Sequence, residues 1–323
     1  MERYNATIVT EFVLLGFHFG HLHQTLFFIG LLFIYILTIV SNILIIAVIK
    51  ENPHLHKPMY FFLSNFSFLE ICYITTTLPT ILKDILSKKK TISAVGCFVQ
   101  FYFFYKLAAT EHLFLMVMAY DRYVAICNPL RYSNIMTEKV CIRMALGCWV
   151  VGALVALLPV ISLSRMSFCG SLEIDHIMCD FLPLMKLACI RGSLTENSFL
   201  IFCWLIVLGC FSFIMLSYGN IIITVLKMSS SKGQSKAFST CASHLSVVFI
   251  FYGTVIFMYL RPSASYSYKL EKEISFCYIA VTPLLNPMIY SLRNKEIREA
   301  LAKVARKFKG LTRKPGPQSL ASQ

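Results

Sequence analysis

The chain has 323 residues, of which 57% are hydrophobic and only 14% are charged, and its mean hydropathy is +0.68. A soluble domain carries roughly a quarter charged residues, so this composition excludes a soluble enzyme, a disordered tail and a disulfide-dense mini-protein. The net charge of +14 would suit a nucleic acid. However, the basic residues are scattered between apolar blocks, which is typical of membrane topology signals. We therefore expect a membrane protein with a lipid bilayer, and no nucleic acid, as its partner.

Seven apolar blocks follow one another along the chain. A spanning helix needs about 20 mostly apolar residues, and blocks of this length occupy 25–49, 59–82, 98–120, 141–161, 197–226, 237–260 and 274–292. They predict an all-α membrane protein with an outer segment over 1–24, a seven-helix bundle over 25–292 and a tail over 293–323. We expect no cleavable signal peptide, so the first helix would act as its own insertion signal.

The distribution of Lys and Arg predicts the orientation of the bundle. With the amino end outside, the inner segments hold clearly more basic residues than the outer ones, as the positive-inside rule requires. This orientation exposes Asn5 in Asn5-Ala6-Thr7, which is a glycosylation acceptor pattern. It also places the basic tail on the inner leaflet. There, apolar residues at helical spacing predict an amphipathic helix lying on anionic lipid: Ile297, Leu301, Val304, Ala305 and Phe308.

The twelve cysteines include no CxxC pair, so they do not indicate a zinc or thioredoxin-like site. Four of them fall on the outer side, where disulfides can form: Cys97, Cys169, Cys179 and Cys189. Four cysteines allow three pairings, and the sequence alone leaves all three open. The other eight are expected to pack as small apolar side chains.

Five strings spread over the chain carry a more specific signal. They are LHKPMYFFLSNFSFLE (55–70), MAYDRYVAIC (118–127), SY (217–218), KAFSTCASHL (236–245) and PLLNPMIYSLRN (283–294). With these strings the chain resembles the odorant receptors, a branch of the rhodopsin-like G protein-coupled receptors. The resemblance implies disulfides Cys97–Cys179 and Cys169–Cys189, which would hold the long loop 161–196 over the mouth of the bundle.

The resemblance also implies the residues of activation. Asp121 would hold the Arg122 guanidinium in the resting state, and Arg122 would later contact the G protein. Because 227–260 contains no acidic residue, this restraint would rest on Asp121 and the Tyr218 hydroxyl. Pro287 lacks an N–H and is expected to bend the seventh helix, which would let Tyr290 swing between two packings. The complete set is Asp121, Arg122, Tyr123, Tyr218, Asn286, Pro287 and Tyr290.

Two carboxylates near mid-membrane, Glu70 and Glu111, are costly there and usually functional. The resemblance places them with Asn42 and Asn286 around a sodium pocket. Two facing carboxylates either share a proton or hold a cation, and both alternatives stay open. Apart from this sodium ion, we expect no cofactor.

The resemblance also selects the helix faces that line a ligand pocket; helical spacing groups the residues on each face. The expected set is Tyr105, Ala108, Ala109, His112, Phe202, Ile206, Tyr252, Val255, Ile256, Tyr259, Phe276 and Ile279. Its side chains are apolar and aromatic, with Tyr hydroxyls and His112 as polar groups and no carboxylate in the outer part. A small, mostly hydrophobic, neutral ligand with one hydrogen-bonding group fits such a pocket best, and the resemblance implies that it is volatile.

These observations predict an odorant receptor that activates a stimulatory olfactory-type G protein and raises cAMP. By resemblance, arrestin and a receptor kinase are further partners, and the location is the plasma membrane of olfactory sensory neuron cilia. A membrane enzyme would need a catalytic cluster such as HExxH or GxSxG, which the chain lacks. A transporter or channel would show internal repeats or a charged pathway, and Glu70 with Glu111 is the only hint of one.

Overall fold

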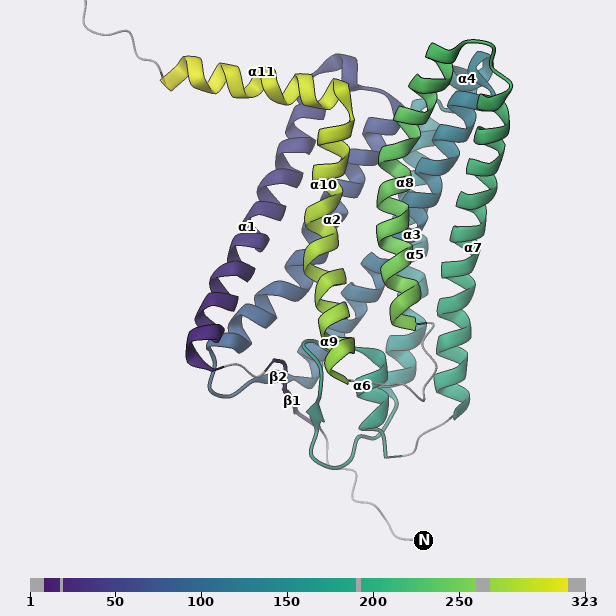
Figure 1. Ribbon diagram of the computed structural model, residues 1–323. Helices are drawn as coiled ribbons and strands as arrows, with labels where there is room; N and C mark the ends of the chain where they lie inside the picture. The colour runs from purple at the N-terminus through teal and green to yellow at the C-terminus, as the bar shows by residue number, and fades with distance from the viewer. Residues whose placement is uncertain (1–8, 18–19, 190–192, 260–267, 313–323) are drawn as a thin grey trace, which may run out of the picture.

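The computed structural model describes residues 9–17, 20–189, 193–259 and 268–312. In this part of the chain, seven helical spans form an elongated bundle, as the apolar blocks predict (Figure 1). The spans are α1 (His21–Glu51), α2 (Pro58–Leu86), α3 (Ala94–Cys127), α5 (Glu138–Ser164), α7 (Ser193–Leu226), α8 (Ser231–Tyr259) and a composite of α9 (Tyr268–Phe276), η4 (Cys277–Val281) and α10 (Thr282–Arg293). Short helices connect or flank them: η1 (Pro53–Leu55), η2 (Pro129–Arg131), α4 (Tyr132–Ile135), α6 (Phe181–Lys186) and α11 (Lys295–Thr312).

Four helical segments in the described part are long and apolar enough to cross a membrane by themselves. They are α1, α2, α5 and residues Ser198–Leu226 of α7, and α8 has a shorter apolar stretch over Cys241–Ile256. Large apolar side chains such as Phe33, Leu154 and Leu205 are exposed on the outside of the bundle. A lipid environment accounts for such surfaces, so the chain is a multi-pass membrane protein.

Local sequence signals set two helix starts. Pro58 occupies the first turn of α2, where its missing N–H costs no hydrogen bond. Ser93 precedes α3, and its hydroxyl accepts a hydrogen bond from the amide of Gly96 at 3.0 Å. Most of the helices extend a few residues beyond the predicted blocks, because helical hydrogen bonding continues into their polar ends.

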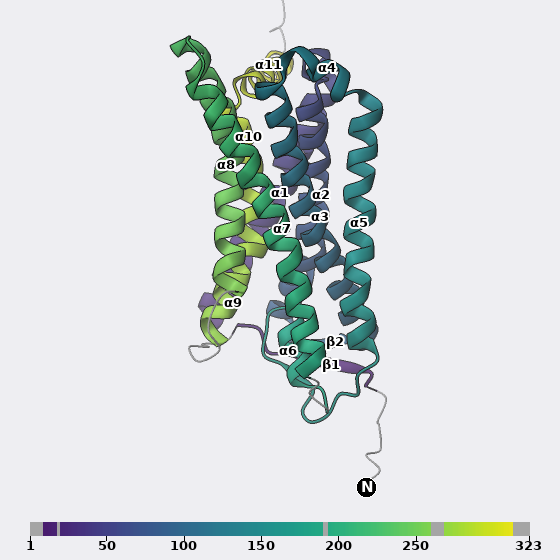
Figure 2. The same ribbon diagram turned by 90° about the vertical axis from the view of Figure 1, so that its right-hand side faces the viewer.

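Helix α3 is the centre of the bundle and packs against α2, α5, α7 and α8. Seen from the side, α7 lies between α8 and α5 (Figure 2). Gly152 of α5 permits the close approach of α3, because a Cβ atom there would lie 2.1 Å from Oγ1 of Thr110 and 3.0 Å from the carbonyl oxygen of Lys106.

One end of the bundle, here called the sheet end, carries three short strands that the apolar blocks do not predict. Strand β1 (Glu11–Leu14) lies between β2 (Thr91–Ser93), which is antiparallel to it, and β3 (Glu173–Ile174), which is parallel. Phe12 and Leu14 are buried and pack with residues of α3 and α6. The amino-terminal segment is therefore part of the cover over this end.

Cross-links hold the sheet end together. The disulfides are Cys97–Cys179 and Cys169–Cys189, the pairing that the resemblance implies. Lys272 of α9 donates hydrogen bonds to Asp175 and to the carbonyl oxygen of Gly16, the latter at 3.2 Å. These contacts tie the amino-terminal segment, the loop after α5 and the seventh span to one another.

The opposite end, here called the α11 end, carries the predicted amphipathic helix. Helix α11 runs across the bundle rather than along it (Figure 1). Ile297 and Ala300 are buried against the bundle, whereas Lys303 and Arg306 are exposed. The side chains of Ala305 and Phe308 lie outside the described residues.

Candidate functional site

A cavity of about 70 Å³ lies between α3, α5, α7, α8 and η4. One water needs roughly 10–15 Å³ of such space, so the cavity has room for a small molecule. Its walls are mostly aliphatic and aromatic: Phe104, Tyr105, Ala108, Ala109, His112, Val155, Ala156, Pro159, Phe199, Leu200, Cys203, Trp204, Ile206, Val207, Val255, Ile256 and Tyr278. Apolar walls with few polar groups are typical of sites for small ligands.

The structure brings together seven of the residues expected from the sequence. Tyr105, Ala108, Ala109, His112, Ile206, Val255 and Ile256 all line the cavity. Tyr252 and Ile279 are buried in the core without lining it, and Phe276 packs against Phe17 and Phe27 instead. The side chains of Phe202 and Tyr259 lie outside the described residues.

The seventh span presents Tyr278 to the cavity instead of Phe276 and Ile279. Its backbone forms a π-helix over Cys277–Val281, in which hydrogen bonds run from i to i+5. This wider turn shifts the side chains that follow relative to a regular helix. Spacing rules based on 3.6 residues per turn therefore select the wrong face here.

Sequence reasoning also missed the wall formed by α5. Val155, Ala156 and Pro159 line the cavity from this helix. Helix α5 is apolar on every side, so its hydrophobic pattern does not distinguish the face toward α3 from the face toward lipid. Gly152, one turn before Ala156, was the available signal, because small residues mark close helix contacts in membranes.

A buried carboxylate, that of Asp180, is hydrogen-bonded to the lining residue Tyr105 but does not itself line the cavity. The hydroxyl of Tyr105 donates a hydrogen bond to Oδ1 of Asp180 at 2.6 Å, and the amide of Phe181 donates to the same atom at 2.7 Å. Asp180 directly follows Cys179, whose bridge to Cys97 fixes it above α3. The carboxylate thus has two donors and serves as a structural link between loop and pocket.

A polar cluster lies deeper in the bundle, around Glu70. The side-chain amide of Asn286 donates to Oε1 of Glu70, and the two carboxyl groups of Glu70 and Glu111 interact electrostatically. Three buried oxygens of this cluster have no hydrogen-bond partner among the described residues, namely Oε2 of Glu70, Oε1 of Glu111 and Oδ1 of Asn286, and the same holds for Oδ1 of Asn42 in α1. Buried polar atoms without partners are rare and call for a bound ion, water or proton.

A second, larger cavity of about 780 Å³ opens at the α11 end. Arg122, Asp121 and Tyr290 line it, together with His244 and Lys232. In the described part of the chain, no ion pair joins Asp121 to Arg122. Instead, Oδ1 of Asp121 accepts a hydrogen bond from the Tyr132 hydroxyl at 2.7 Å. The charge of Arg122 still acts electrostatically on Asp121, and the restraint of Arg122 by Asp121 that the resemblance implies stays a prediction.

The Tyr218 hydroxyl is engaged elsewhere as well. It lies 2.8 Å from Nδ1 of His244, whose Nε2 lies 3.1 Å from the carbonyl oxygen of Leu115. Because a carbonyl oxygen only accepts, Nε2 donates, and Nδ1 of the neutral ring accepts from Tyr218. This chain of hydrogen bonds joins α7, α8 and α3 beside the cavity at the α11 end.

The remaining activation residues lie around the same region. Tyr123 is half-buried next to Tyr120. Tyr290 is buried against Phe66, and its hydroxyl has no hydrogen-bond partner among the described residues. Pro287 lies inside α10, three residues before Tyr290.

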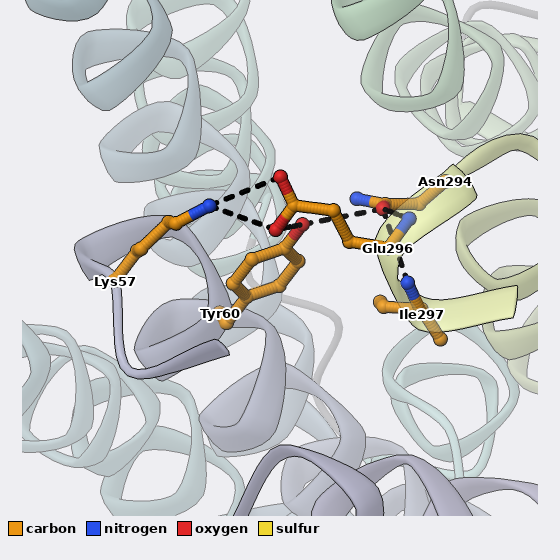
Figure 3. Close-up of polar contacts among 5 residues, drawn as sticks. All are labelled: Lys57, Tyr60, Asn294, Glu296 and Ile297. Atoms are coloured by element: carbon orange, nitrogen blue, oxygen red, sulfur yellow. Dashed lines mark hydrogen bonds and ion pairs between the residues drawn. The ribbon is translucent and has the colours of Figure 1, made fainter. Parts of the chain in front are cut away.

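A polar junction forms the rim of the cavity at the α11 end, where α10 passes into α11 (Figure 3). Nζ of Lys57 lies 2.8 Å from Oε2 of Glu296, and the Tyr60 hydroxyl donates to the same oxygen at 3.0 Å. Oδ1 of Asn294 accepts from the amides of Glu296 and Ile297 and thereby caps α11. Lys57 and Tyr60 belong to the start of α2, so the junction joins distant parts of the chain.

Comparisons with known proteins agree with this geometry. A family model described as "Olfactory receptor" matches residues 31–307. The human olfactory receptor 11H6 is 50% identical over 92% of this chain and 90% of its own length, and the human olfactory receptor 11G2 is 48% identical over 93% and 87%. The crystal structure of squid rhodopsin has the same fold, with a TM-score of 0.69 at 16% identity over 94% of this chain and 90% of the rhodopsin chain. The chain therefore belongs to the olfactory receptor family, whose members are receptors with the rhodopsin-like fold and not enzymes.

Proposed function

We propose that this receptor binds small, mostly hydrophobic volatile molecules in the cavity between α3, α5, α7, α8 and η4. We further propose that binding activates a stimulatory olfactory-type G protein and raises cAMP. The observation that carries this proposal is that α3 lines both cavities: His112 lies at the apolar one and Arg122 at the α11 end. A shift of α3 against α7 and α8 would thus couple the two.

For binding to cause activation, the ligand must bind the active arrangement of the helices more tightly than the resting one. A ligand shifts an equilibrium only by its difference in affinity for the two states. The hydrogen bonds from Tyr218 to His244 and from His244 to Leu115 join the three helices that would move. Arg122 makes no ion pair with Asp121 here, so its guanidinium can meet an acceptor of the G protein in the cavity at the α11 end.

The cluster around Glu70 is proposed to take a sodium ion. Its donor set consists of carboxylate and amide oxygens, the ligands that hard cations prefer. Glu70, Glu111, Asn42 and Asn286 would hold the ion, which would neutralise the carboxylates. The alternative, one proton shared by Glu70 and Glu111, uses the same residues. A sodium-dependent basal signal that disappears in Glu70→Gln would favour the ion.

The proposed topology places the amino end outside, with Asn5 glycosylated and the α11 end facing the cytoplasm. Helix α11 has exposed Lys303 and Arg306, which suit an anionic inner leaflet. The proposed location is the plasma membrane of olfactory sensory neuron cilia, and arrestin and a receptor kinase are proposed as later partners.

A cAMP reporter assay tests the proposal in cells supplied with an olfactory-type G protein and trafficking accessories. A panel of diverse odorants is applied to the wild type and to Arg122→Ala, with surface staining for both. The matched control is Arg131→Ala, because Arg131 is exposed on η2 and does not line the cavity. We expect a response that Arg122→Ala abolishes and Arg131→Ala preserves. An odorant-dependent current without cAMP would instead support a channel.

A further inference from the structure

The hydrogen bond of His112 fixes which of its ring nitrogens can receive a ligand. Nδ1 of His112 lies 2.8 Å from the carbonyl oxygen of Ala108, one helical turn earlier. A carbonyl oxygen only accepts hydrogen bonds, so Nδ1 must carry the hydrogen. In the neutral ring, Nε2 is then left with a lone pair and acts as an acceptor.

This acceptor belongs to a side chain that is buried and held in place. His112 is 5% exposed and lines the apolar cavity, and its Nε2 has no hydrogen-bond partner among the described residues. The ring packs edge-to-face on Phe251 and Tyr252, with centroids 4.6 and 5.3 Å away. These contacts keep the imidazole from turning to find another partner.

The Tyr105 hydroxyl and the Cys203 thiol line the same cavity but are less suited to this role. The Tyr105 oxygen can still accept, but the hydroxyl is already hydrogen-bonded to Asp180, and the thiol of Cys203 is a weak hydrogen-bonding group. Asp180 does not line the cavity, so it does not meet a ligand there as a partner for a cationic amine. Among the described lining residues, His112 is the one with a buried side-chain nitrogen or oxygen that lacks a partner.

We propose that Nε2 of His112 accepts a hydrogen bond from the ligand, so that the receptor prefers neutral molecules with an O–H donor, namely alcohols and phenols. The inference rests on the proposed function, because it names the ligand class of that cavity. Ethers, ketones and esters of similar shape offer only acceptors and would face the lone pair of Nε2. A carboxylate would do the same and would also lose its hydration in an apolar site.

The size of the expected preference follows from the cost of an unmade hydrogen bond. Leaving a buried acceptor unpaired costs enough to change affinity by about tenfold to a hundredfold. A site that hydrogen-bonds the hydroxyl of a substrate discriminates strongly against an analogue that lacks the hydroxyl. An apolar pocket discriminates less strongly against an analogue that lacks one methylene group. The preference for an alcohol over its ether should therefore exceed the difference in response between two alcohols whose chains differ by one methylene group.

The experiment compares matched pairs of odorants on matched variants. The probes are the straight-chain primary alcohols from hexanol to decanol with their methyl ethers, and substituted phenols with the corresponding anisoles. The receptors are the wild type, His112→Phe, which keeps a ring but removes the acceptor, and His112→Gln, which restores one. Tyr105→Phe is the control, because it alters a lining aromatic residue whose hydroxyl is engaged with Asp180. The cAMP dose response is measured at equal surface level.

We expect the wild type to respond to at least one alcohol or phenol at about tenfold to a hundredfold lower concentration than to its ether. His112→Phe should remove that difference, His112→Gln should restore part of it, and Tyr105→Phe should move both members of a pair alike. Tyr252→Phe should leave the difference in place, because the ligand and not the Tyr252 hydroxyl is the partner of Nε2.

Two results would overturn the inference while leaving the proposed function intact. One is an equal wild-type response to the two members of each active pair. The other is an equal loss of both responses in His112→Phe at normal surface level. A wild type that reaches the surface and raises no cAMP with any odorant of a broad panel would instead contradict the proposed function.

Discussion

Nζ of Lys57 lies 2.8 Å from Oε2 of Glu296, which connects the residue before α2 with the first turn of α11. Both side chains are about half exposed, so the pair itself contributes little to stability. Its effect is geometric: together with Asn294 and Tyr60 it fixes the angle at which α11 leaves α10 (Figure 3).

Asn294→Ala should fray the start of α11. The substitution removes the oxygen that accepts from the amides of Glu296 and Ile297, and loss of such a cap costs about 1 kcal/mol. Hydrogen exchange measured by mass spectrometry should show faster exchange over the first turn of α11. Asn294→Asp, which retains an acceptor, should stay close to the wild type, and equal exchange in all three proteins would contradict the assigned cap.

Acid should release the same junction. Burial alone would raise the pKa of Glu296, but hydrogen bonds from Lys57 and Tyr60 and the charge of Lys57 outweigh it, so the pKa lies below the usual 4.5. A carboxyl with a lowered folded-state pKa stabilises the fold above its unfolded pKa, and this contribution is lost as the pH falls through the folded pKa. A spin-label distance between α2 and α11 should therefore change below about pH 4.5 in the wild type. Glu296→Gln should lack this step, whereas Glu138→Gln, at the exposed start of α5, should retain it.

Gly152→Ala should destabilise the bundle. Its Cβ would lie 2.1 Å from Oγ1 of Thr110 and close to the α3 backbone, so α3 and α5 must separate. Overpacking of this kind costs about 1–3 kcal/mol. Gly147→Ala, on the same helix with nothing within 4 Å of the added atom, is the matched control. Thermal unfolding in detergent should show a lower midpoint for Gly152→Ala alone; equal midpoints would mean that the helices do not meet this closely.

Removal of the Cys97–Cys179 bridge should cost more stability than removal of Cys169–Cys189. The two bridges span 82 and 20 residues, and the entropy that a cross-link removes from the unfolded chain grows with loop length. Cys97→Ser/Cys179→Ser should lower the unfolding midpoint further than Cys169→Ser/Cys189→Ser. The reverse order would show that local packing, and not loop length, governs the stability of the sheet end.

Hydropathy alone predicted the seven spans. In the hydrocarbon core of a membrane the backbone N–H and C=O groups must be hydrogen-bonded within the protein, so a long apolar segment forms a helix. The family resemblance together with helical spacing predicted the wall on α3, where Tyr105, Ala108, Ala109 and His112 line one cavity. Helical spacing was insufficient on the seventh span, because the π-helix over Cys277–Val281 shifts Tyr278 into the wall. On α5 the composition is apolar on every side, so the sequence did not indicate which face of the helix lines the cavity.

The polar contacts of the site were harder to predict. Asp180 meets Tyr105 only because a disulfide folds a distant loop over α3. Asp121 pairs with Tyr132 in this conformation, and the sequence offers no rule that selects this neighbour over Arg122. Strand β1 depends on partners that lie far along the chain, so its local pattern could not reveal it.

The parallel pairing of β1 with β3 has a consequence for biosynthesis. Leu14 pairs with Ile174, so the first strand to leave the ribosome must wait while the first four spans are translated and inserted. At typical rates of translation this interval is on the order of ten seconds. During that time the apolar side chains of Phe12 and Leu14 lack their final neighbours, and a chaperone on the side of the membrane that holds the amino end would have its opportunity to bind.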